Sequence, residues 1–149
     1  YATDAPETVI MNKMKTLAVT ANRYFRMYGQ YPNAVEKMLA GAQNIGYVNP
    51  FNREQTVPMR RSLVPHDEES SDMNLSDFAE MQDAIRRLGI WGPGTSPPGT
   101  VEFYRCAAGP EGDMFMIRGI DRNGNVIKGS RPGTTFLIIC SSGRARIMN

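Results

Sequence analysis

The sequence predicts an α+β domain in which a long N-terminal helix packs on a small antiparallel β-sheet, with short helices in the loop that connects them. Helical periodicity dominates the first 29 residues, and short β-type segments follow one another from residue 101 onward. Helical and β-type segments are therefore separated along the chain, which is typical of α+β folds and not of alternating α/β folds. A length of 149 residues suits one domain, 1–149. We expect a helix over 1–29, a helical and loop connection over 30–100, and an antiparallel sheet over 101–149.

The N-terminal helix has one apolar face. Its apolar residues recur at the spacing of a single helical face: Ile10, Met14, Leu17, Ala18, Ala21, Tyr24, Phe25 and Tyr28. Asp4 and Glu7 fit a capping box, and Pro6 is tolerated in a first turn. Gly29 is a typical helix stop. The opposite face is polar and includes Lys13, Lys15 and Arg23, so it is expected to meet water or a neighbour.

The connection contains signals for two short helices. Asn33 and Glu36 form a capping pattern for a helix that ends near Ala40, before Gly41. The segment "LSDFAEMQDAIRRLG" (75–89) has one apolar face and ends in glycine. Between them, "GYVNPFNREQ" is rich in turn residues, and residues 64–74 are polar and acidic, as in an exposed loop.

Hairpin signals join the C-terminal strands. "CAAGPEGD" (106–113) lies between two β-type segments and is expected to form a strand-to-strand turn. A phosphate-binding loop would instead lead into a helix N-terminus. Asn123-Gly124 is a strong two-residue turn signal, and "SSGR" indicates a second hairpin before the last strand.

Composition limits the classes of function. The chain has 17 basic and 15 acidic residues, a net charge of +2, which does not mark a dedicated nucleic-acid binder. No run approaches the ~20 apolar residues of a membrane span. The chain begins at Tyr1 and not at Met, so an anchor or a signal could lie upstream.

The two cysteines, Cys106 and Cys140, lie in predicted strands and outside any zinc-type motif. A single disulfide would imply an oxidising compartment, whereas two buried thiols would imply none. Cysteine number does not decide between these interpretations.

No enzyme is predicted. The one histidine, His66, lies in the acidic loop beside Asp67, Glu68 and Glu69, where a solvated loop is the simpler interpretation. A cysteine nucleophile would need a positioned histidine, and common hydrolase, metalloprotease and nucleotide-binding motifs are absent from the sequence.

Asp121, Asn123 and Asn125 stand at i, i+2 and i+4, a spacing that can gather oxygen ligands for calcium. The sixth position of that loop is Val126 and the twelfth is Pro132, where an EF-hand needs Gly and Glu. A plain hairpin is the competing interpretation. Otherwise no cofactor is expected.

Two arginine pairs, Arg60-Arg61 and Arg86-Arg87, could form a patch for an anionic partner. Acidic residues are interleaved with them, so an ordinary solvated surface explains them as well.

Several motifs together resemble those of type IV pilins and the pseudopilins of type II secretion. The helix that ends in "YFRMYGQYPN" is similar to the end of the pilin spine helix, and "GYVNPF" resembles the loop that often follows it. "VEFYRCAAGPEGD" resembles the strand and Ser-x-Gly-Pro-Asp-Gly turn of pseudopilins. Residues 53–98 match no part of the family.

The resemblance implies a non-enzymatic structural subunit of a pilus or pseudopilus filament in the bacterial cell envelope. It implies a periplasmic or extracellular head, and an inner-membrane anchor upstream of Tyr1. Implied partners are other pilin-like subunits, through the N-terminal helix, and the pilus or secretion assembly machinery. Contacts are expected on the outer face of the helix and on loops at 53–74.

A Cys106–Cys140 disulfide would fasten the sheet as in type IV pilins, while the calcium loop of major pseudopilins is poorly matched. The alternative is a binding module of the minor-pilin type, holding DNA or another acidic surface through the arginine pairs.

Overall fold

A computed structural model describes residues 5–32, 46–60, 96–109 and 112–148. This part of the chain contains one helix, α1 (Pro6–Tyr28), and seven strands in two sheets. The strands are β1 (Tyr47–Val48), β2 (Gln55–Thr56), β3 (Met59–Arg60), β4 (Val101–Gly109), β5 (Gly112–Gly119), β6 (Leu137–Ser141) and β7 (Arg144–Met148).

Helix α1 ends where predicted, before Gly29, but it begins at Pro6 where the prediction extended the helix to residue 1, and its cap also differs. Pro6 occupies the first turn, and Ala5 is the N-cap with no side-chain capping hydrogen bond, so Glu7 completes no capping box there. Asp4 lies outside the described residues. Gly29 ends the helix as predicted, with a φ of 75° that glycine adopts without strain, and its N–H donates to the Phe25 carbonyl oxygen at 2.7 Å.

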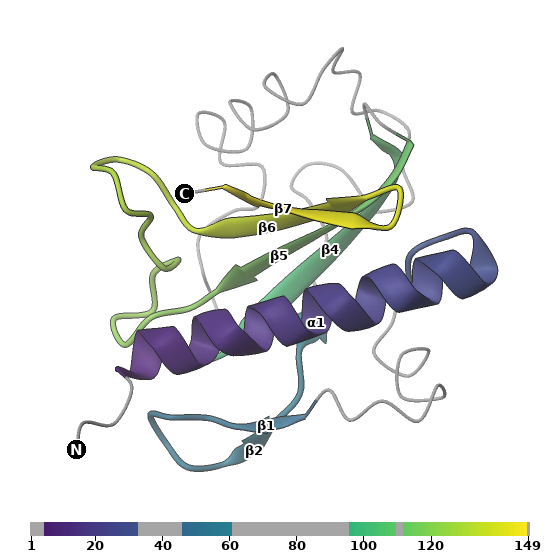
Figure 1. Cartoon of the computed structure of the whole chain (residues 1–149). Helices are drawn as coiled ribbons and strands as arrows, with labels where there is room; N and C mark the ends of the chain where they lie inside the picture. The colour runs from purple at the N-terminus through teal and green to yellow at the C-terminus, as the bar shows by residue number, and fades with distance from the viewer. Residues whose placement is uncertain (1–4, 33–45, 61–95, 110–111, 149) are drawn as a thin grey trace.

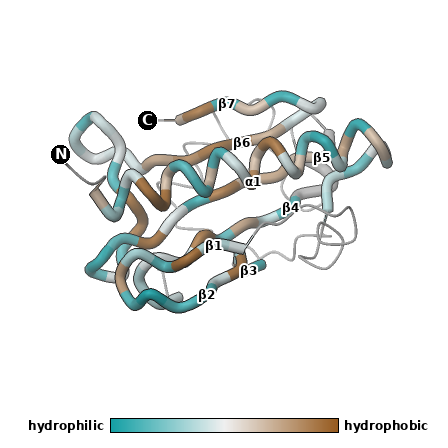
Figure 2. Tube along the Cα trace, turned by 60° about the horizontal axis from the view of Figure 1, so that its bottom comes forward, coloured by the Kyte–Doolittle hydropathy of each residue, from teal (hydrophilic) through white to brown (hydrophobic). Residues whose placement is uncertain are grey.

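One face of α1 forms the core with the sheet. Ile10, Met14, Leu17, Ala18 and Ala21 are buried, as their spacing predicts. The helix lies across one face of the five-stranded sheet, mainly on β5 and β6 (Figure 1). Hydrophobic and hydrophilic turns alternate along the helix in Figure 2. The sheet contributes aromatic and β-branched side chains to the same cluster: Val101, Phe103, Phe115, Ile117 and Ile138.

Strands β4 to β7 form an antiparallel meander. The "CAAGPEGD" segment does connect two antiparallel strands, β4 and β5, as predicted. The "SSGR" hairpin is also confirmed, because Ser142 and Gly143 turn between β6 and β7 with φ of 53° and 79°. Positive φ at both central residues gives the turn a twist that matches the flanking strands.

The predicted fold class is wrong in its sheet. The structure has a separate two-stranded sheet, β1–β2, and a five-stranded sheet in which β3 pairs in parallel with β4. The described chain is thus mostly β with mixed pairing, and not a helix on a small antiparallel sheet. Residues 46–60 were predicted to be loop because two-residue strands show no measurable periodicity. The short helices predicted near 33–40 and 75–89 lie outside the described residues.

The central strands are buried on both faces. On the face away from α1, the cross-strand register aligns Glu102, Arg118 and Leu137 in one row and Tyr104, Met116 and Ile139 in the next, and all six are buried. The edge strand β7 differs, since four of its five residues are exposed. The meander therefore has a solvent-exposed edge next to α1.

Tyr47 fixes the β1–β2 hairpin to the start of β4. Its buried hydroxyl donates to the Gly99 carbonyl oxygen at 2.7 Å and accepts from the Val101 N–H at 2.8 Å. Burial raises the pKa of Tyr47 to about 12. Asn49 completes the junction by donating to the Pro98 carbonyl oxygen at 2.8 Å.

Replacing Tyr47 with Phe should destabilise the fold by about 1–3 kcal/mol, because two buried backbone groups lose their partner. Urea unfolding followed by circular dichroism measures the change. Tyr28→Phe is the matched control, since Tyr28 is 60% exposed. Equal stability of the two variants would contradict this role for the Tyr47 hydroxyl.

Candidate interaction surface

The outer face of α1 is basic and partly apolar. Thr8, Asn12, Lys15, Val19, Arg23 and Arg26 are exposed and follow one line along the helix. No acidic residue follows Glu7 in this helix. Val19, in the middle of the line, exposes 55% of its surface. The predicted contact residues Lys15 and Arg23 are thus on the solvent side, whereas Lys13 is half-buried.

The C-terminal end of α1 exposes large apolar side chains. Met27 and Tyr28 are 66% and 60% exposed, and the rings of Tyr24 and Tyr28 lie 4.5 Å apart. Their surface continues the outer face of the helix, which therefore offers both cations and apolar area.

Tyr31 fixes this end of the helix to the sheet. Its ring stacks on Phe25 of α1 and on Phe115 of β5, at centroid distances of 4.6 and 5.9 Å. Its hydroxyl donates to Asn22 Oδ1 at 2.7 Å and accepts from the Gly143 N–H at 3.0 Å. Burial raises the pKa of the Tyr31 phenol well above its ordinary value, so this hydrogen bond to Asn22 is donated across the accessible pH range.

The backbone of Tyr31 is anchored as well. Its N–H donates to Asp113 Oδ2 at 2.7 Å, and Asp113 forms an ion pair with Arg105 at 3.0 Å. The Tyr-Pro pair after Gly29 belongs to the motif that resembles pilins, but its spacing did not indicate these long-range partners of Tyr31.

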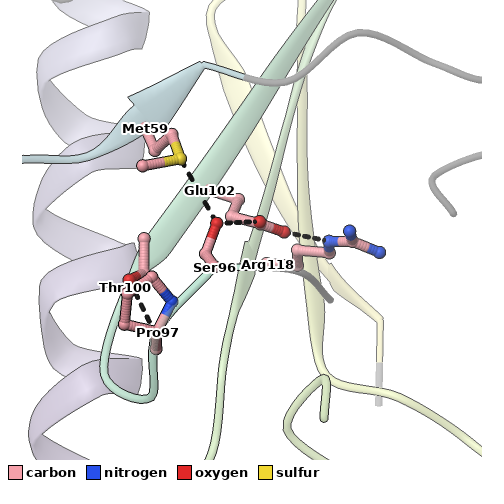
Figure 3. A network of polar contacts seen from close by, with 6 residues as sticks. All are labelled: Met59, Ser96, Pro97, Thr100, Glu102 and Arg118. Atoms are coloured by element: carbon pink, nitrogen blue, oxygen red, sulfur yellow. Dashed lines mark hydrogen bonds and ion pairs between the residues drawn. The ribbon is translucent and has the colours of Figure 1, made fainter. Parts of the chain in front are cut away.

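A buried polar network lies on the sheet face away from α1 (Figure 3). Arg118 Nε donates to Glu102 Oε1 at 2.6 Å, and the Ser96 hydroxyl donates to Glu102 Oε2 at 2.6 Å. Met59 Sδ lies 3.3 Å from the same hydroxyl. The side chains of Glu102 and Arg118 are 0% and 4% exposed. Sequence reasoning missed this pair, although a charged residue inside each apolar strand segment was a usable signal.

This network favours a structural role. Both oxygens of Glu102 accept hydrogen bonds, so the buried carboxylate is compensated on each side. The Glu102 side chain is 0% exposed to solvent. We interpret this network as a link between Met59 of β3 and the central strands β4 and β5, which carry Glu102 and Arg118.

The predicted disulfide is not formed. Cys140 is a free, buried thiol on β6. Cys106 lies on β4, and β5 runs between these two strands. Two strand spacings of about 4.8 Å put the backbones about 10 Å apart, whereas a disulfide needs Cα atoms within about 7 Å. Both cysteines lie in strands, as predicted, but the sequence does not show which strand lies between them in the sheet.

The three residues of the predicted calcium loop form a closed turn. Asp121 Oδ1 accepts from the N–H groups of Asn123 and Asn125, at 2.8 and 3.0 Å. Asp121 and Asn123 line a cavity of about 340 Å³ together with the cationic Arg122 and Lys128, which disfavour a metal ion. Among the described residues, no three His, Cys, Asp or Glu side chains are grouped as metal ligands.

The predicted arginine patch is only partly described. Arg60 is exposed at the end of β3, and Arg61, Arg86, Arg87 and His66 lie outside the described residues. A second groove, of about 740 Å³, is lined by the 125–135 loop, including Lys128 and Arg131. Its lining holds no histidine or carboxylate, so it offers no general base.

Cys140 should resist alkylation in the native protein. Burial raises its pKa from 9.0 to about 12, so the reactive thiolate is scarce at pH 8. Mass spectrometry after iodoacetamide treatment should find Cys140 unmodified in buffer and modified in urea. A native Cys106–Cys140 bond, seen as a 2 Da deficit without reductant, would contradict the structure.

The same thiol predicts a loss of stability in alkali. Between pH 9 and 12 the folded state keeps a proton that the unfolded state has lost, so the free energy of unfolding falls as pH rises through this window. Cys140→Ala should weaken that fall in urea unfolding, and an unchanged pH dependence would contradict the assignment.

Removing one partner of the buried ion pair should be costly. Glu102→Gln removes the buried negative charge that faces Arg118 at 2.6 Å, and we expect a loss of about 3–5 kcal/mol in urea unfolding. The double variant Glu102→Gln/Arg118→Met should lose less than the sum of the single variants. Arg122→Met is the control, because the Arg122 side chain is 60% exposed and its 3.8 Å pair with Glu7 should contribute about 0–1 kcal/mol.

No helix among the described residues is long and apolar enough to cross a membrane. Comparison with family models, curated proteins and solved structures gives no significant match to this chain.

Proposed function

We propose that this protein is a non-enzymatic structural subunit of a pilus or pseudopilus filament in the bacterial cell envelope, and that it assembles through the outer face of α1. The observation that carries this proposal is that α1 has apolar residues on two faces, one buried against the sheet and one exposed. Ile10, Met14 and Leu17 are buried against the sheet, while Val19 and Met27 are exposed on the surface.

The exposed apolar area is suited to an interface. Covering the exposed parts of Val19, Met27 and Tyr28 would each contribute on the order of 1–2 kcal/mol. Scattered exposed apolar residues are ordinary, but here they share a single helix with a row of cations. An interface that joins this face to a different surface of the next subunit is open, and it generates a filament and not a closed dimer.

The pilin-type motifs support the same proposal. The "YFRMYGQYPN" segment includes both the exposed end of α1 and Tyr31, which holds this end against the sheet. A rigid connection between helix and sheet would let a contact made by the helix orient the whole domain.

Assembly of the full-length protein tests the proposal. The parent protein should sediment as filaments visible by negative-stain electron microscopy, and Val19→Asp/Met27→Asp should lower the sedimenting fraction at least tenfold. Lys128→Asp/Thr135→Asp, on the exposed 125–135 loop, is the matched control. Circular dichroism checks that each variant is folded. A monomeric parent, or an assembly indifferent to Val19 and Met27, would overturn the proposal.

A further inference from the structure

Strand β7 forms one edge of the five-stranded sheet (Figure 1). Among the described strands it is the last in the order β3-β4-β5-β6-β7, and β6 is its one partner. The register between β6 and β7 is continuous, without a bulge, and β7 contains no proline. Four of its five residues are exposed. Bulges and prolines are common devices that stop an edge strand from pairing further, and β7 has neither.

The β6–β7 turn determines which backbone groups of β7 point outward. The turn has two residues, both with positive φ, so the residues that flank it form a hydrogen-bonded pair. Hydrogen-bonded and non-hydrogen-bonded pairs alternate along an antiparallel ladder. Arg144 and Arg146 are therefore bonded to β6, whereas the N–H and C=O groups of Ala145 and Ile147 point away from it. An antiparallel neighbour could exchange two hydrogen bonds with each of these two residues.

The side chains of β7 form an apolar row and a basic row. Ala145 and Ile147 stand opposite Cys140 and Ile138, which belong to the core under α1, so this row is on the α1 side of the sheet. Ile147 is 51% exposed. The alternate residues of β7, two of them arginines, are on the other side, and residues 137–148 contain no Asp or Glu. A strand added to this edge would thus meet apolar area on one side and cations on the other.

Charge disfavours a second copy of β7 as that added strand. Antiparallel registers that pair Ala145 with Ala145 or with Ile147 of a second copy place an arginine directly opposite an arginine. Like charges in directly opposite positions destabilise a sheet. A segment with carboxylates at alternate positions would instead place a negative charge opposite each arginine. The same two arginines therefore oppose self-pairing and favour an acidic partner.

We infer that β7 binds an extended segment of a partner protein as an added antiparallel strand, in which apolar residues alternate with carboxylates. Backbone hydrogen bonds to Ala145 and Ile147 provide affinity, and the alternate side chains provide specificity. Arginine suits the basic row because its planar guanidinium can bind a carboxylate through two parallel hydrogen bonds. This binding site goes beyond the proposed function, since it uses the edge of the sheet and not the outer face of α1.

A synthetic peptide of sequence TTVEVET is the probe, because its valines and glutamates alternate as the two rows require. Fluorescence anisotropy with the full-length protein should show saturable binding, and TTVKVKT should bind at least tenfold more weakly. Arg144→Glu/Arg146→Glu should reverse the preference between the two peptides. Lys128→Glu/Arg131→Glu changes the net charge equally, on a different loop, and should leave binding of TTVEVET within about twofold of the parent.

Amide hydrogen exchange distinguishes an added strand from charge attraction alone. In the free protein, the outward N–H groups of Ala145 and Ile147 should exchange faster than the N–H of Arg146, which is bonded to β6. Saturating TTVEVET should slow exchange at Ala145 and Ile147 at least tenfold. Ala145→Pro removes one outward donor that β6 does not use, so it should weaken peptide binding at least tenfold. Circular dichroism checks that this variant is folded, and the charge-reversal variant keeps the test decisive if it is not.

Several outcomes would overturn the inference. They are failure to bind TTVEVET, binding that Arg144→Glu/Arg146→Glu does not change, and binding without slower exchange at Ala145 and Ile147. Equal weakening by both double charge variants would indicate a net-charge effect, and would also overturn it. Self-association that is lost in Ala145→Pro, measured by sedimentation velocity, would assign the edge to a second copy instead. None of these results depends on filament assembly through Val19 and Met27, so the two proposals fail separately.

Discussion

The position of α1 on the sheet depends on one side chain, Tyr31. Its ring is stacked between a helix residue, Phe25, and a strand residue, Phe115, and its hydroxyl joins Asn22 to the turn at Gly143. Burying a phenol costs little free energy when its hydroxyl both donates and accepts a hydrogen bond, whereas burying an unpaired hydroxyl is strongly destabilising. Tyr31 therefore fixes the C-terminal end of α1 against the sheet by directional contacts, in addition to apolar packing.

The contact between the end of α1 and the β6–β7 turn follows from that constraint. Once the helix end is fixed beside the β6–β7 turn, Arg26 Nη1 donates to the Gly143 carbonyl oxygen at 3.4 Å. This contact joins two segments that are more than a hundred residues apart in the sequence.

Part of this arrangement could be predicted from the sequence. Local signals predicted the apolar face of α1, its end at Gly29 and the hairpin at Ser142-Gly143, because each depends on neighbouring residues only. The parallel pairing of β3 with β4 was missed, since two residues carry no period and their partner lies some forty positions away. The predicted capping box is not formed at Glu7, because Ala5 is the N-cap and makes no side-chain capping hydrogen bond.

The sequence by itself determined that α1 buries Ile10, Met14, Leu17, Ala18 and Ala21 and that its other face is cationic, because helical spacing is a property of adjacent turns. It also predicted Tyr28 on the apolar face, but Tyr28 is 60% exposed. Tertiary structure alone decided the partners. It paired Glu102 with Arg118 inside the sheet, separated Cys106 from Cys140 by a strand, and brought the Gly143 turn to the end of the helix. The physical reason is that strand order and helix docking are set by long-range packing, which no local pattern records.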